Sequence, residues 1–180
     1  MNLVKKLLFF VIGIVVLLLV IGFFSKKDYA VEREIVINKP KAEVFEYIKH
    51  LKNQDNYSVW AKRDPNAKKE YKGIDGTVGF VSAWDSTNEK VGKGEQEIVK
   101  IVDGERMDVK LRFKTPFGMS NDDGYFITES VSQSQTKVKW GFKGTMKYPM
   151  NVMLLFMNME KMLGKDLEYG LKNLKTVLEK

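Results

Sequence analysis

The sequence contains no cysteine and a single histidine, His50, and these absences exclude several kinds of site. Without cysteine the chain forms no disulfide and offers no thiolate ligand, and one histidine does not supply an ordinary zinc site. No spacing of serine, histidine and aspartate supports a nucleophilic triad. Gly92-x-Gly94 lacks the third glycine and the following helix of a dinucleotide-binding loop. The sequence therefore predicts no metal and no cofactor, and it assigns no catalytic residue.

Charge is missing from one long stretch near the N-terminus. Leu7–Phe24 contains no charged side chain, and at about 1.5 Å per residue it spans roughly 27 Å, close to the thickness of a bilayer core. Lysine pairs flank it at Lys5–Lys6 and Lys26–Lys27, where long cationic side chains reach the headgroups. The run exceeds the apolar part of a signal peptide, about 7–15 residues, and no small-x-small cleavage pattern follows. Residues 1–27 are therefore expected to be an uncleaved transmembrane anchor that contacts the lipid bilayer.

The orientation of this anchor is less constrained by the sequence. Two lysines lie on each side, so the positive-inside rule does not select a side. A short basic leader before an apolar run behaves like a signal sequence, which favours an N-terminus inside the cell. We therefore expect a single-pass membrane protein whose domain, residues 28–180, lies on the extracytoplasmic side.

The basic character of the chain comes mainly from the anchor region. The formal net charge is +7, and four lysines lie in the first 27 residues without any acid, so the remainder carries +3. The other lysines alternate with Glu and Asp and do not gather into a basic stripe, so we expect no nucleic-acid partner. About 150 residues remain after the anchor, enough to bury a core and enclose a cavity.

The first part of this domain reads as a strand followed by helices. Tyr29–Ile37 alternates apolar and charged residues, as a half-buried strand does. Pro40 then stands near the first position of a helix whose apolar stripe includes Val44 and Ile48. Asn53–Asn66 is a polar stretch in which a short second helix fits.

From Lys68 to Met146 the apolar residues recur with a period of two. Met107–Lys114 is the clearest case, with apolar and charged side chains in strict alternation. Turn-forming residues separate the runs at Asp75-Gly76, Asp103-Gly104, Asn121-Asp122-Asp123-Gly124 and Ser132-Gln133-Ser134-Gln135. The pattern predicts about six antiparallel strands with one wet and one apolar face.

The C-terminal part is expected to form one long helix from about Pro149 to Glu179. Its second half carries an apolar stripe from Met159 to Leu178, whereas its first half is apolar on most sides. Six of the nine methionines lie between Met146 and Met162. Such a helix is the natural cover for the apolar face of a curved sheet.

The order of these elements and several short motifs resemble a known superfamily. Ile35–Phe45 looks like its first strand and helix, and Trp60 stands where such chains commonly carry a tryptophan. Gly92-Lys93-Gly94-Glu95, Thr136–Trp140 and Gly164–Leu178 also match its later elements. On these residues the chain resembles the SRPBCC superfamily, which includes START lipid-transfer and birch-pollen-allergen-like domains, and within it the polyketide cyclase/dehydrase-like branch. The resemblance covers residues 30–179.

This resemblance implies an α+β helix-grip fold: a curved antiparallel sheet of about seven strands wrapped on a long C-terminal helix, here preceded by one transmembrane helix. It also implies a cavity between sheet and helix that takes an apolar small molecule or lipid. The inward-facing residues expected to line it are Trp60, Phe80, Trp84, Met107, Leu111, Phe113, Trp140, Phe142, Met153, Phe156 and Met157.

Three functions fit this reading. The preferred expectation is a membrane-anchored binding domain for an apolar small molecule or lipid, without catalysis. One alternative is an interaction or scaffold module at the membrane surface with a filled core. The other is a cyclase- or hydrolase-like enzyme acting on an apolar substrate, which requires at least one polar group, such as Asp64, Tyr57 or His50, that points into the cavity with a perturbed pKa.

Overall fold

The structure is a computed structural model that describes residues 2–115 and 118–180. Its helical elements are α1 (Leu3–Phe24), α2 (Lys41–Lys49), η1 (Leu51–Asn53), α3 (Gln54–Tyr57), α4 (Val59–Arg63), η2 (Met150–Leu155) and α5 (Met159–Leu178). Its strands are β1 (Asp28–Ile37), β2 (Lys68–Lys72), β3 (Val81–Asp85), β4 (Lys93–Val102), β5 (Arg106–Thr115), β6 (Gly118–Ser132) and β7 (Gln135–Thr145). The expected order of strand, helices, six strands and closing helix is confirmed.

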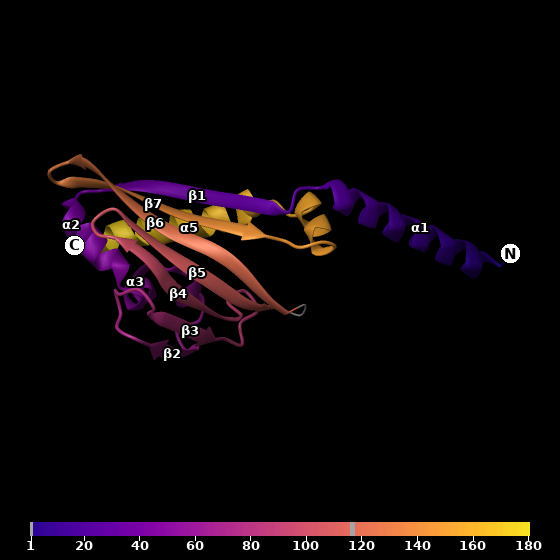
Figure 1. The fold of residues 1–180 in the computed structure, drawn as a ribbon, viewed down its shortest axis with the longest axis horizontal. Helices are drawn as coiled ribbons and strands as arrows, with labels where there is room; N and C mark the ends of the chain where they lie inside the picture. Colours follow the sequence, from indigo (N-terminus) through magenta and orange to yellow (C-terminus); the bar gives the residue numbers. More distant parts are fainter. Residues whose placement is uncertain (1, 116–117) are drawn as a thin grey trace.

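The seven strands form one antiparallel sheet in the order β1-β7-β6-β5-β4-β3-β2. The first strand pairs with the last, with Val31 opposite Phe142 and Ile35 opposite Val138. The sheet curves along α5, and α2 and α3 lie at the end of the domain opposite α1 (Figure 1). This is the α+β helix-grip arrangement that the sequence predicted.

Alternation along the strands separates an apolar inner face from a charged outer face. On β5, Met107, Val109 and Leu111 are buried on the inside. On the outside, Arg112 donates to the Glu95 and Glu97 carboxylates at 2.7 and 2.6 Å. Partly exposed pairs of this kind add little stability each, so burial on the inner face is what holds the sheet in place.

The closing helix is shorter than the sequence predicted. α5 begins at Met159, because the Asn158 side chain accepts a hydrogen bond from the Lys161 backbone N–H at 2.8 Å and so caps the helix there. The preceding residues form η2, which packs against α1. The expectation of one helix from Pro149 to Glu179 is therefore wrong for its first ten residues, where an apolar neighbour other than the sheet is available.

α1 projects away from the rest of the chain (Figure 1). Its 22 residues have a mean hydropathy of 3.3 in the most apolar window, and only Gly22 among them is buried. By length and composition the helix is able to cross a membrane, and a signal sequence near an N-terminus has the same two properties.

α5 approaches the sheet closely where it carries glycine. A Cβ on Gly170 would lie 2.6 Å from Cζ3 of Trp140, which is itself packed among aromatic rings and has no room to move. A Cβ on Gly164 would instead meet the Arg33 guanidinium, the far end of a flexible side chain that forms a partly exposed ion pair with Glu160. A glycine-to-alanine substitution is therefore expected to reduce stability more at position 170 than at position 164.

We predict that Gly170→Ala lowers the free energy of unfolding by about 1–2 kcal/mol, because overpacking against Trp140 outweighs the gain in helix propensity of about 1 kcal/mol. Gly164→Ala is the matched control and should leave stability unchanged or raise it. Urea unfolding of the full chain in detergent, followed by tryptophan fluorescence, measures both. Equal effects of the two substitutions would contradict the close contact at Trp140.

Candidate functional site

A cavity of about 1100 Å³ lies on the inner face of the sheet. Its wall comes from the inward residues of β3 to β7, from the short helices α3 and α4, from the first turns of α5, and from the segment between β7 and η2. Most of this surface is apolar, with polar groups at a few points. Sites for small apolar molecules have this size and this character.

Aromatic rings form the part of the wall over β7 and the short helices. Trp60 from α4 packs edge-on against Trp140 and Phe142, with ring centroids 5.9 and 5.8 Å apart. Trp84 on β3 contacts Phe113 on β5 at 5.8 Å in a similar geometry. These contacts hold the rings in fixed orientations, so the wall keeps its shape without an occupant.

One end of the cavity wall is exposed to solvent. Met119 on β6, Tyr148 after β7 and Met153 on η2 line the cavity and have exposed fractions of 55%, 44% and 42%. β6 begins and β7 ends at this side, where α1 also leaves the domain (Figure 1). The mouth of the cavity therefore lies next to the inner end of α1.

A buried carboxylate stands among the apolar residues of the wall. Asp122 on β6 is 7% exposed and accepts a hydrogen bond from Ser120 Oγ at 3.0 Å. Burial raises the pKa of this carboxyl above its usual value of 3.8. Burial, together with the neighbouring Asp122, also raises the pKa of Tyr29 to about 12. Within residues 2–115 and 118–180, no lysine or arginine forms an ion pair with Asp122.

Two further polar points lie on the side of the short helices. Asp64 accepts a hydrogen bond from Ser86 Oγ at 2.5 Å. Gln96 on β4 donates its amide to Gln54 on α3 at 2.9 Å. Both contacts bridge the helices to the strands, so they close this side of the cavity.

The structure places most of the sequence-predicted wall residues at the cavity and some elsewhere. Those on the wall are Trp60, Trp84, Leu111, Phe113, Trp140, Phe142 and Met153. Phe80 is instead buried in the core beside Tyr71, because it precedes β3 in a loop and does not belong to the strand. Met107 is wholly buried towards the other end of β5.

Phe156 and Met157 are also not on the wall. They were expected on a helix that faces the sheet, but they follow η2, and Phe156 is 75% exposed.

The sequence analysis missed Asp122, because Asn121–Gly124 was interpreted as a turn. Pairing with β5 on one side and β7 on the other keeps these residues extended within β6.

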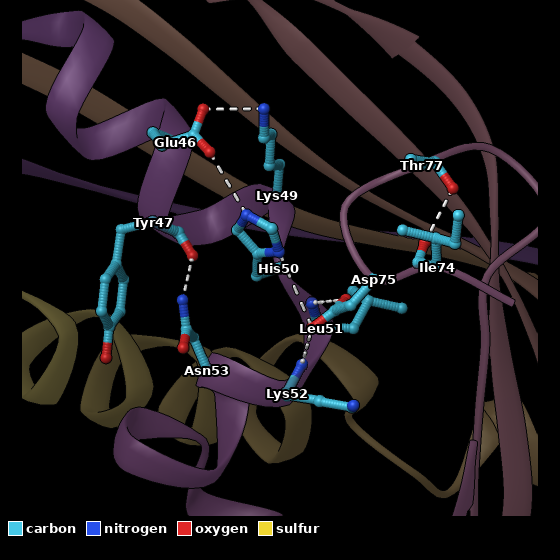
Figure 2. A network of polar contacts seen from close by, with 10 residues as sticks. All are labelled: Glu46, Tyr47, Lys49, His50, Leu51, Lys52, Asn53, Ile74, Asp75 and Thr77. Carbon is cyan, nitrogen blue, oxygen red and sulfur yellow. Dashed lines mark hydrogen bonds and ion pairs between the residues drawn. The ribbon is translucent and has the colours of Figure 1, made fainter. Parts of the chain in front are cut away.

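The three polar residues considered for catalysis lie in different surroundings. Asp64 is on the cavity wall. Tyr57 is fully buried in the core, where its hydroxyl has no hydrogen-bond partner among the described residues, and burial raises its pKa. His50 lies outside the cavity, 3.2 Å from the Glu46 carboxylate (Figure 2).

The network around His50 has a structural role. Asp75, from the loop between β2 and β3, accepts hydrogen bonds from the backbone N–H groups of Leu51 and Lys52 at 2.8 and 3.2 Å (Figure 2). These bonds satisfy backbone donors at the start of η1 and tie that loop to it. Since Leu51 is a wall residue, the network positions one side of the cavity.

In the described part of the chain, no group of three or more His, Asp or Glu side chains is placed to hold a metal ion.

Solved structures share this fold at low sequence identity. Norcoclaurine synthase from Thalictrum flavum superposes with a TM-score of 0.61 at 13% identity, over 87% of this chain and 98% of that one. The same synthase in complex with dopamine and hydroxybenzaldehyde gives 0.60 at 11% identity, over 88% and 90%. The Aha1 dimer from Colwellia psychrerythraea gives 0.56 at 14% identity, over 84% and 96%. At these identities the likeness concerns the fold alone.

Comparison with curated protein sequences found no match. The profile of one family, described as polyketide cyclase / dehydrase and lipid transport, matches residues 29–179, which include the closing helix and all seven strands except the first residue of β1. We conclude that this chain belongs to the polyketide cyclase / dehydrase and lipid transport family.

Proposed function

We propose that the protein is a membrane-anchored binding domain for an apolar small molecule or lipid, with residues 1–27 as the anchor and 28–180 as the binding domain. The observation that carries this proposal is the cavity of about 1100 Å³ with a largely apolar wall. The first alternative, a scaffold with a filled core, does not explain a cavity of this volume, because natural protein interiors are close-packed.

The chemistry of the wall supports an apolar ligand. Its rings and methionines offer dispersion contacts to varied shapes, and a ligand that fills the cavity removes apolar surface from water at about 25 cal/mol per Å². The mouth beside α1 would place the ligand's entry near a bilayer that holds α1. We propose that the domain lies on the extracytoplasmic side, and the short basic leader before α1 is the only argument for this orientation.

The first test uses Met159, a wall residue, and Met162, an exposed residue on the same helix. Asp in the first turn of α5 suits the helix dipole at either position, so Met159→Asp and Met162→Asp form a matched pair. Only Met159→Asp places a charge against an apolar ligand. We expect it to reduce ligand occupancy by at least about tenfold, whereas Met162→Asp leaves occupancy unchanged.

Occupancy is measured with the full chain in lipid nanodiscs that contain a diazirine-bearing palmitic acid. After irradiation, peptide mapping counts crosslinks on β5 and β7, which supply the wall, and on α1, which reports contact with bulk lipid. Labelling of α1 without labelling of β5 and β7 would remove the binding function and leave the anchor. Equal labelling of wild type and Met159→Asp would contradict the cavity as the binding site.

A second candidate function is acid–base catalysis on an apolar substrate, and Asp122 favours it. A carboxyl with a raised pKa beside a tyrosine hydroxyl in a cavity is typical of groups that exchange protons with a substrate. Asp64, Tyr57 and His50, the groups first considered, do not form such a pair. The arrangement of Asp122 and Tyr29 supports proton transfer and no more specific reaction.

The protonation of Asp122 is testable through stability. Between pH 3.8 and the raised pKa, the folded chain binds more protons than the unfolded chain, so the contribution of Asp122 to stability falls as the pH rises through this window. We therefore expect the free energy of unfolding of Asp122→Asn, relative to wild type, to increase with pH across it. Urea titrations at several pH values measure this difference. Asp123→Asn, an exposed neighbour, is the control, and a pH-independent difference at Asp122 would remove the support for catalysis.

A further inference from the structure

The segment that connects β7 to α5 exposes large apolar side chains. Tyr148, Met153, Leu155 and Phe156 have exposed fractions of 44%, 42%, 48% and 75%. The segment carries no acidic residue from Lys147 to Asn158. Contiguous apolar surface of this kind marks a contact with another apolar phase.

This surface is continuous with the apolar surface of α1. The rings of Phe23 and Tyr148 are in edge-on contact, with centroids 6.1 Å apart. Phe23 and Phe24 are themselves 65% and 82% exposed at the inner end of α1. In Figure 1 the short coil of η2 lies beside that end of α1, away from the turn between β6 and β7.

A buried hydrogen bond fixes the two apolar elements to each other. The Asn151 side chain is fully buried and donates to the Gly22 carbonyl at 2.6 Å. That carbonyl belongs to the last turn of α1, where backbone acceptors lack partners within the helix. Gly22 allows the approach, because a Cβ there would lie 2.3 Å from Val152 Cγ2. η2 is therefore docked on α1.

Three exposed lysines lie on the segments next to this apolar surface. Lys26 and Lys27 follow α1, and Lys147 precedes η2; all three are exposed. The Met146 backbone N–H donates to the Lys27 carbonyl at 2.8 Å, so the two basic segments lie side by side. Lysines beside an apolar surface that enters a bilayer can reach the phosphates of the lipid headgroups.

We propose that η2 and the residues around it, Tyr148–Phe156, insert into the interface of the bilayer that holds α1, so that the cavity opens onto lipid and not onto water. The proposal rests on the proposed membrane anchor. Tyr148 and Met153 belong both to this inserted surface and to the cavity wall, so an apolar ligand passes between bilayer and cavity without crossing water. The partner is the lipid bilayer, met through its acyl chains and its anionic headgroups.

The absence of cysteine makes a direct test available, because each introduced cysteine is the single labelling site. Phe156→Cys, Gly13→Cys and Ser134→Cys are labelled with an environment-sensitive nitrobenzoxadiazole dye in the full chain. Phe156 is exposed, Gly13 has no atom within 4 Å of a Cβ, and Ser134 is exposed in the β6–β7 turn. The proteins are reconstituted into vesicles of phosphatidylcholine and phosphatidylglycerol that contain a nitroxide lipid, with the nitroxide either high or low on the acyl chain.

We expect the dye at 156 to shift its emission to the blue and to lose fluorescence mainly to the high nitroxide. The dye at 13 should lose fluorescence mainly to the low nitroxide, and the dye at 134 should lose none. Quenching at 13 with none at 156 would overturn the insertion of η2 and leave the anchor standing. Absence of quenching at 13 would overturn the anchor and the insertion together.

Discussion

The cavity depends on where α5 touches the sheet. The helix lies against β1 and β7, and the missing side chain at Gly170 lets it approach Trp140 closely. Helix and sheet therefore meet tightly along one half of the inner face. Towards β3 and β4 the short helices bridge to the sheet through side-chain contacts such as Gln54 with Gln96. Tight packing on one side and bridging on the other leave the interior volume between them.

The strands and their faces were predictable from the sequence, because alternation records burial directly. Leu111, Phe113, Trp140 and Phe142 were assigned to the inner face from that alternation, and the structure places them on the cavity wall. Asp122 was not predictable in the same way. Asn, Asp and Gly favour turns by local chemistry, whereas the extended path of β6 through Asn121–Gly124 is set by two neighbouring strands, which are far away in the sequence.

The long closing helix was only partly predictable for a related reason. From Met159 onward the apolar stripe shows which face meets the sheet, and the helix there agrees with it. Before Asn158 the residues are apolar on most sides, so periodicity does not indicate their neighbour. The neighbour is α1, and the contact depends on one buried amide, Asn151, that no periodic pattern marks. Phe156 and Met157 were misplaced because this neighbour was not foreseen.

The docking of η2 on α1 also affects the entropy of any encounter with lipid. A domain on a loose tether samples many orientations, and each productive contact with a membrane then costs the loss of that freedom. Here the hydrogen bond from Asn151 to Gly22 restricts orientation once, when the chain folds. The cavity mouth is thereby held towards the end of α1, so in the proposed binding function the cost of alignment would not be met again at each entry or exit of a ligand.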